Sequence, residues 1–179
     1  FNRRFSPHAK EARTFFSSRS NPLVMLYRIN GGRIPADHWV QDPDVGGGRV
    51  IGEVCHFVDY MHALCASPPT SVFASRVGRH SSGITEDQCS LSLTFGDGSI
   101  GTIIYTAEGS SALQKEHFEA HADGMSLVMS DFMETRTYHN GKSALFKTAK
   151  RDKGFAQEMA QFVQAIEQGL PPVIPFEQI

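Results

Sequence analysis

Alternating apolar and polar residues predict β-strands over much of the chain. In residues 88–95, the side chains of Cys89, Leu91, Leu93 and Phe95 fall on one face of an extended segment. Glycines in the turn at residues 96–99 favour a hairpin with the apolar run 100–107. Shorter runs between turn residues predict further strands at residues 23–29, 71–77, 114–122, 125–129, 132–138 and 143–146.

Three other segments have the 3.6-residue period of an amphipathic helix. The first begins at Ser6, a good N-cap before Pro7, and runs to about residue 18. The second follows the glycines at residues 46–48 and runs to about residue 64. The third covers residues 155–168 and ends at Gly169, before two prolines. Its apolar stripe consists of Phe155, Met159, Phe162, Val163 and Ile166.

These elements predict an α+β fold. Six to eight strands in a largely antiparallel or mixed, open-faced sheet would have helices packed on one face. A chain of 179 residues is long enough for one domain with a real core, and we assign residues 1–179 to it.

The central helix contains the best candidates for chemistry. Val50, Val54, Phe57, Met61 and Leu64 form its apolar stripe, widened by Ile51, Cys55 and Val58. A second, narrow stripe contains Arg49, Glu53, His56 and Tyr60. Charged stripes on helices are common, so the simpler interpretation is that Arg49 and Glu53 form an ordinary ion pair on a wet face and that His56 is a surface or helix-packing histidine. Alternatively, Glu53 and His56 point into a cleft, where the imidazole moves a proton on or off a substrate hydroxyl.

A long loop at residues 30–44 lies just before this helix. It contains His38 and Trp39, the only tryptophan, and a polar and aromatic loop of this length suits recognition of a sugar or small polyol. The alternative is that Trp39 simply anchors the loop onto the body of the domain.

Composition excludes several partners. The formal net charge is −2 and no basic run stands out, which argues against nucleic acid and anionic membranes. No apolar run approaches the roughly 20 residues that span a bilayer. Three cysteines without a CxxC motif or paired histidine spacing argue against disulfides and a metal site, and favour free thiols in a reducing cytoplasm.

The glycines at 46–48, His56 and Asp59 resemble the GGGxxxDxGxHxxD motif in the C-terminal domain of the Gfo/Idh/MocA oxidoreductases. The chain departs from this motif at two positions, where Gly52 replaces the aspartate and Val54 replaces the next glycine. Glu53 lies one place from the missing aspartate. Residues 154–179 also resemble the closing helix and proline-rich turn of the family.

The resemblance implies a fold like the C-terminal domain of glyceraldehyde-3-phosphate dehydrogenase, with subunits packing through the open sheet face. It also implies that His56 transfers the hydroxyl proton, and that Glu53 or Asp59 orients and charges the imidazole. Arg3, Arg4, His38, Trp39 and Asp59 would help hold the substrate. For Arg3 and Arg4 the alternative is a solvated terminal charge pair.

The family's cofactor site is missing from the chain. The strand–GxGxxG–helix unit that holds a dinucleotide is absent, and so is the lysine motif of the nucleotide-binding domain. We therefore expect a substrate-binding and oligomerisation domain without its N-terminal Rossmann domain, unable to bind NAD or NADP and inactive alone.

The resemblance implies that the intact protein would be a cytoplasmic, homo-oligomeric, NAD- or NADP-dependent dehydrogenase. Its substrate would be a secondary alcohol of a sugar, nucleotide sugar or polyol. The alternative is a non-catalytic module for self-association or ligand binding, which the departure at Gly52 keeps open.

Overall fold

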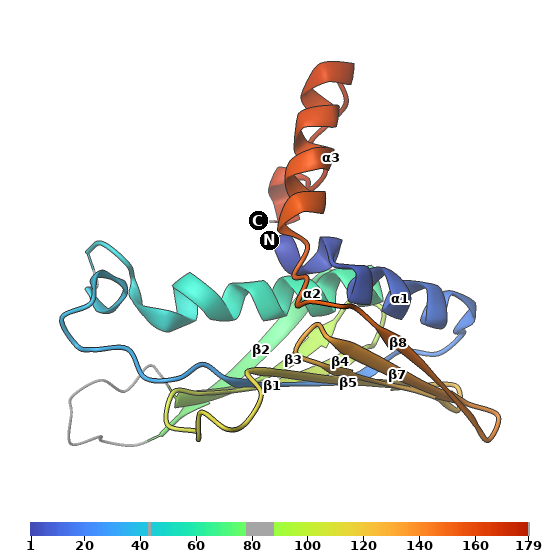
Figure 1. Cartoon of the computed structure of the whole chain (residues 1–179), viewed down its shortest axis with the longest axis horizontal. Coiled ribbons are helices and arrows are strands. Elements are labelled where there is room, and N and C mark those ends of the chain that lie inside the picture. Colours follow the sequence, from blue (N-terminus) through green and yellow to red (C-terminus); the bar gives the residue numbers. More distant parts are fainter. Residues whose placement is uncertain (43, 78–87, 179) are drawn as a thin grey trace.

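The computed structural model describes residues 1–42, 44–77 and 88–178 and has an eight-stranded sheet with helices on one face (Figure 1). The strand order is β2-β3-β4-β1-β5-β6-β7-β8. Neighbouring strands are antiparallel except β1 and β4, which are parallel. The predicted α+β architecture is confirmed.

Most elements lie within two residues of the predicted ranges. The strands are β1 (Val24–Asn30), β2 (Pro69–Arg76), β3 (Gln88–Phe95), β4 (Ile100–Thr106), β5 (Glu116–Ala122), β6 (Met125–Ser130), β7 (Glu134–His139) and β8 (Lys142–Lys147). The helices are α1 (Pro7–Phe15), α2 (Cys55–Cys65) and α3 (Phe155–Gln168). Short 3-10 helices cover Asn2–Phe5, Phe16–Ser18, Trp39–Gln41 and Phe176–Gln178, and a π-helical turn at Val50–Val54 precedes α2.

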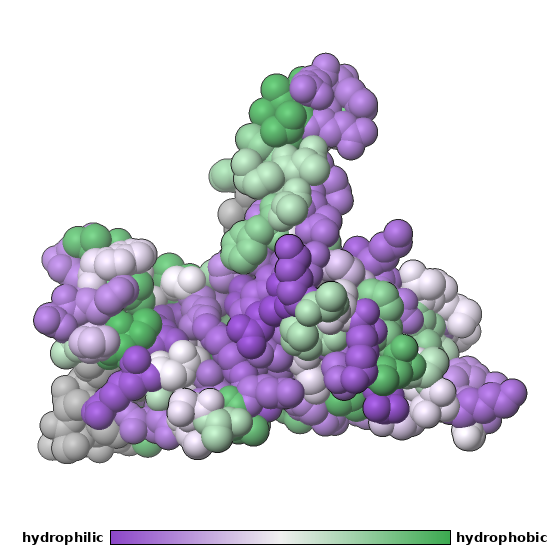
Figure 2. All heavy atoms as spheres, viewed as in Figure 1, coloured by the Kyte–Doolittle hydropathy of each residue, from purple (hydrophilic) through white to green (hydrophobic). Residues whose placement is uncertain are grey.

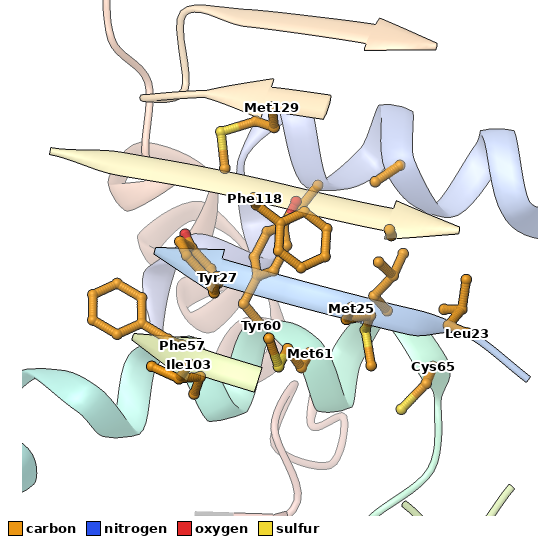
Figure 3. Packing of buried hydrophobic residues seen from close by; sticks show 14 of the residues in the cluster. Leu23, Met25, Tyr27, Phe57, Tyr60, Met61, Cys65, Ile103, Phe118 and Met129 are labelled. Carbon is orange, nitrogen blue, oxygen red and sulfur yellow. The ribbon is translucent and has the colours of Figure 1, made fainter. Parts of the chain in front are cut away.

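The core lies between α2 and the middle of the sheet (Figure 3). Tyr27 of β1 is fully buried, and its ring centroid lies 4.8 Å from that of Phe57 and 5.3 Å from that of Phe118. Gly101 on β4 lets α2 approach closely, because a Cβ there would lie 2.6 Å from the sulfur of Met61. Burial of these large side chains fixes the position of α2 on the sheet.

The π-helical turn changes which faces the residues of the central helix occupy. The predicted apolar stripe is largely confirmed, since Val54, Phe57, Met61 and Leu64 are buried. Ile51, expected to widen that stripe, is 70% exposed. Tyr60, expected on the polar stripe, is a core residue at 2% exposure. The wide turn of five residues accounts for Ile51, because it shifts the 100° spacing that the prediction assumed. Tyr60 lies in regular α2, where it is three residues after Phe57 and four before Leu64 and therefore shares their buried face.

Helix α3 extends away from the sheet and from the other helices (Figure 1). The apolar stripe predicted for it is exposed along its length, as the green band in Figure 2 shows. Phe155, Met159, Phe162, Val163 and Ile166 are between 46% and 66% exposed.

The sheet face opposite α1 and α2 also keeps apolar side chains exposed. Val24 of β1 and Ile100 and Ile104 of β4 are 52%, 47% and 43% exposed. They alternate with the buried side chains that face the helices. No helix of the described residues is long and apolar enough to cross a membrane.

Candidate functional site

The Arg49–Glu53 pair lies partly buried at the start of the central helix. Nη2 of Arg49 lies 3.0 Å from Oε2 of Glu53, and the two side chains are 3% and 18% exposed. The same guanidinium donates to the carbonyls of Gly31 and Gly32. The pair therefore joins the long loop to the helix and is not an ion pair on a wet face.

Glu53 accepts from two further side chains. The hydroxyl of Tyr105 on β4 donates to Oε2 at 2.6 Å, and the ammonium of Lys115, just before β5, donates to Oε1. Burial by itself would raise the pKa of Glu53, but the hydrogen bonds from Lys115, Tyr105 and Arg49 lower it to about 2. Glu53 is thus a fixed anion whose two oxygens are occupied by three side-chain donors.

His56 is half-buried and lies beside the N-terminal segment. Its ring makes an edge contact with Phe1 at 5.5 Å, and its Nδ1 is buried with no hydrogen-bond partner. Burial and the Arg3 guanidinium lower the pKa of His56 to about 4. The nearby carboxylate of Glu53 raises the pKa of His56, as expected from the sequence, but burial and Arg3 outweigh this effect. The imidazole is therefore neutral at pH 7.

Arg3 binds a buried carboxylate that sequence analysis missed. Nε and Nη2 of Arg3 donate to the two oxygens of Glu116 at 2.9 and 3.0 Å, and the guanidinium lies 4.7 Å from the ring centroid of Phe57. Glu116 is fully buried and also accepts from Tyr27 at 2.8 Å and from Lys153. Burial acts to raise the pKa of Glu116, and the Arg3 bonds outweigh it and keep the pKa low.

Arg4 binds Asp59 in a second pair. Nε of Arg4 donates to Oδ2 of Asp59 at 3.0 Å, and Nη2 binds Oδ1. The Asp59 side chain is 2% exposed, and burial raises its pKa despite the bonds from Arg4. Neither Asp59 nor Glu53 hydrogen-bonds to His56 in the described part of the chain. The two arginines fasten the N-terminal turn to the domain and are not a solvated terminal charge pair.

His38 and Trp39 lie on the outside of the long loop. His38 caps the short helix Trp39–Gln41 by accepting from the amide of Val40 at 3.2 Å. Trp39 is 62% exposed, so it does not anchor the loop in the core. The structure does not bring these two residues into contact with His56 or Glu53.

The glycines before the helix have local roles. A Cβ on Gly46 would collide with the backbone of Trp39 and Val40, while Gly47 and Gly48 have φ values of 67° and 83°. Backbone geometry therefore accounts for all three glycines without a ligand.

Four functional candidates were not predicted from the sequence: Tyr27, Tyr105, Lys115 and Glu116. The two tyrosines gave a usable signal, because each occupies an inward position of a strand where its hydroxyl needs a buried partner. Lys115 and Glu116 gave none, because their partners lie far away in the sequence.

The described residues do not fit a dinucleotide. The glycines at residues 46–48 follow a loop and precede a π-helical turn. In the described residues, 1–42, 44–77 and 88–178, no strand leads through a glycine-rich turn directly into a helix. In the same ranges no three histidine, cysteine, aspartate or glutamate residues are grouped to hold a metal ion. All three cysteines are free.

We predict that Glu53→Gln destabilises the domain in a pH-dependent way. The folded-state pKa of Glu53 is below its ordinary value of about 4.5, so its contribution is present above that pH and is lost as the pH falls towards 2. Urea unfolding should show the variant less stable by about 1–3 kcal/mol at pH 7, with the difference closing at acid pH.

Glu134→Gln is the matched control. Glu134 pairs with Lys147, and its side chain is 45% exposed, so the change should leave the stability at pH 7 almost unchanged. A Glu53→Gln effect of equal size at pH 7 and pH 2.5 would contradict a role for the ionised carboxylate.

Solved structures share the whole fold at low sequence identity. Aldose-aldose oxidoreductase from Caulobacter crescentus, complexed with glycerol, matches with a TM-score of 0.83 and 15% identity, covering 99% of this chain and 56% of that one. UDP-N-acetylglucosamine 3-dehydrogenase from Acidithiobacillus ferrooxidans matches with a TM-score of 0.74 and 18% identity, covering 95% and 52%.

Levoglucosan dehydrogenase, in complex with NADH and levoglucosan, matches with a TM-score of 0.73 and 16% identity, covering 94% and 56%. The chain thus spans about half the length of these proteins. No curated protein matches its sequence. The family model of the GFO/IDH/MocA C-terminal domain matches residues 22–127, more than half of the 179. The chain therefore belongs to the GFO/IDH/MocA C-terminal domain family.

Proposed function

We propose that the intact protein is an NAD(P)-dependent oxidoreductase that interconverts a secondary alcohol and a ketone of a sugar, nucleotide sugar or polyol. This chain would be its substrate-binding half. The observation that carries the proposal is a neutral, half-buried His56 beside fixed charges, in a domain of an oxidoreductase family. The similar solved proteins include an aldose oxidoreductase and two sugar dehydrogenases, one of them bound to NADH.

His56 would accept the hydroxyl proton when the alcohol is oxidised. A neutral imidazole is in the correct state to do so, and the burial of Nδ1 leaves Nε2 as the nitrogen that faces a substrate. In the reverse direction the imidazolium would return the proton to the carbonyl oxygen. Lys115, with a side chain 33% exposed and held by Glu53, would donate to a substrate oxygen.

Arg3, Arg4, Asp59 and Glu53 would act mainly by positioning their neighbours. Arg3, Arg4 and Asp59 are bound within the domain, so we propose that they hold the N-terminal turn beside His56. His38 and Trp39 are exposed and would contact the substrate from the loop.

A dinucleotide-binding domain would hold the cofactor and would lie outside this chain, whose described residues offer no cradle for it. The exposed stripe of α3 supports this division (Figure 2), because a helix with one apolar face needs a partner to cover it. The free cysteines favour a cytoplasmic location.

We expect NADH and NADPH to bind only to a protein that contains the upstream reading frame as well. Fluorescence titration of both nucleotides against the short and the extended protein tests this. Failure of the extended protein to bind either nucleotide would exclude the oxidoreductase and favour the alternative, a non-catalytic module for self-association or ligand binding.

In the extended protein, His56→Ala should reduce turnover by about 100-fold or more while changing the melting temperature little, because general acid–base catalysis contributes on that scale. His62→Ala is the matched control, since His62 lies on the same helix but lines a different groove, beside Arg4 and Lys10. Equal losses of activity and stability in His56→Ala would assign it a packing role.

We propose that the open face of the sheet joins subunits, since it keeps Val24, Ile100 and Ile104 exposed in neighbouring strands. Ile104→Lys should convert the oligomer to a smaller species in sedimentation velocity. Ile51→Lys, an exposed isoleucine next to α2, is the control and should leave the oligomer intact. An unchanged oligomer in Ile104→Lys would place the interface elsewhere.

A further inference from the structure

A groove lies in the angle between α3 and the layer formed by α1 and α2 (Figure 1). It has a volume of about 720 Å³. Its lining comes from the N-terminal turn, α1, the C-terminal end of α2, Gln157 and Gln161 of α3, and Gln178. Arg4 is the only residue that it shares with the residues predicted for the candidate site. The proposed reaction therefore gives this groove no role.

The charged side chains that line the groove at pH 7 are all cations, namely Arg4, Lys10 and Arg13. The carboxylate that compensates Arg4 belongs to Asp59, whose side chain is 2% exposed and does not line the groove. Lys10 and Arg13 have no carboxylate partner in the part of the chain that the structure describes. The groove therefore carries uncompensated positive charge, in a chain whose formal net charge is −2.

Two of these cations are held close together. Nη1 of Arg13 donates to the backbone carbonyl of Arg4 at 2.8 Å, and the Arg4 guanidinium is itself fixed by Asp59. Burial and the neighbouring Arg4 both lower the pKa of Arg13, as expected where no anion lies between two cations. Lys10 lies three residues before Arg13, on the same side of α1. This concentration of like charge is unfavourable until an anion relieves it.

The cations also have unused donors. An arginine has five N–H groups, and Arg13 uses one of them on the carbonyl of Arg4. The Lys10 ammonium has no hydrogen-bond partner within the described residues, and the exposed amide of Gln161 is a further donor. Burial and Arg4 lower the pKa of His62, so this residue adds little charge at pH 7. Cationic donors without a carboxylate among them suit the oxygens of a phosphate group.

The groove lies on the polar side of α3. Successive helical residues are 100° apart, so Gln157 lies about 200° round the helix from Phe155, and Gln161 follows one turn later. These two glutamines line the groove, whereas Phe155 and Met159 belong to the exposed apolar stripe on the other side. A domain that covers the stripe would therefore leave the groove open.

We propose that this groove binds a phosphate group, either free or carried by a small organic molecule. Lys10 and Arg13 would donate to the phosphate oxygens, and Gln161 would donate from α3. The ligand would thus bridge α1 and α3. The proposal does not rest on the proposed function, because Lys10, Arg13 and Gln161 have no part in the proton transfer assigned to His56.

Amide NMR titration of this chain with inorganic phosphate and with glycerol 3-phosphate, at constant ionic strength, tests the proposal. At least one of the two should give saturable shifts at Lys10, Arg13 and Ala63, whereas glycerol should give none. Tighter binding of glycerol 3-phosphate would identify a phosphate ester as the ligand, and tighter binding of inorganic phosphate would identify the free ion.

Lys10→Glu should weaken this binding about tenfold or more, because it removes a charge-assisted donor and places a negative charge at the groove. Lys10 is exposed, so the change leaves the core intact. Lys142→Glu is the matched control, since Lys142 is an exposed lysine at the start of β8, and this change should leave binding unaltered.

Any of four results overturns the proposal. They are no saturable shift at these residues, equal shifts with chloride in place of phosphate, unchanged binding in Lys10→Glu, and binding by this chain that is lost in the protein with the upstream reading frame. Nucleotide binding and turnover are measured separately, so a failure here leaves the oxidoreductase intact, and a failure there leaves the phosphate site intact.

Discussion

The rest of the site depends on the hydrogen bonds that the buried carboxylate of Glu116 accepts. It accepts from Arg3 of the N-terminal turn, Tyr27 of β1 and Lys153 before α3, so it ties three distant parts of the chain to β5. A buried charge that loses its partners is strongly destabilising, commonly by about 3–5 kcal/mol. The domain can therefore keep this glutamate only while all three segments are in place, and this fixes Arg3 against Phe57.

Burial and the position of Arg3 together set the protonation state of His56. Two carboxylates, Glu53 and Glu116, favour the imidazolium, while burial and the Arg3 guanidinium oppose it and prevail. A histidine near carboxylates would ordinarily be expected to hold its proton. Here each carboxylate is held by cations of the protein, Glu116 by Arg3 and Lys153 and Glu53 by Arg49 and Lys115. The proton-accepting state of the imidazole is thus a property of the whole charge arrangement.

Local signals explain which parts of the fold could be predicted. Ser6, Gly98, Gly141 and Gly169 mark caps and turns by their own chemistry, and alternation identified the strands between them. Pairings between distant residues leave no such trace. Arg3 and Glu116 are 113 positions apart, so neither stood out as part of a pair. Periodicity also predicted the stripe of α3, but it could not show that nothing in the described residues covers it.

The structure also changes which residues deserve a chemical role. Arg3, Arg4, Asp59 and Glu53 match the resemblance or lie next to its motif, yet their polar atoms are already occupied by other side chains. A saturated group can position its neighbours, but it has little capacity left for a ligand. The groups at the candidate site with unused capacity are the imidazole of His56 and the ammonium of Lys115, whose side chain is 33% exposed. Recognition would therefore depend on the groups that the fold leaves unsatisfied, and of the residues that match the motif only His56 is one of them.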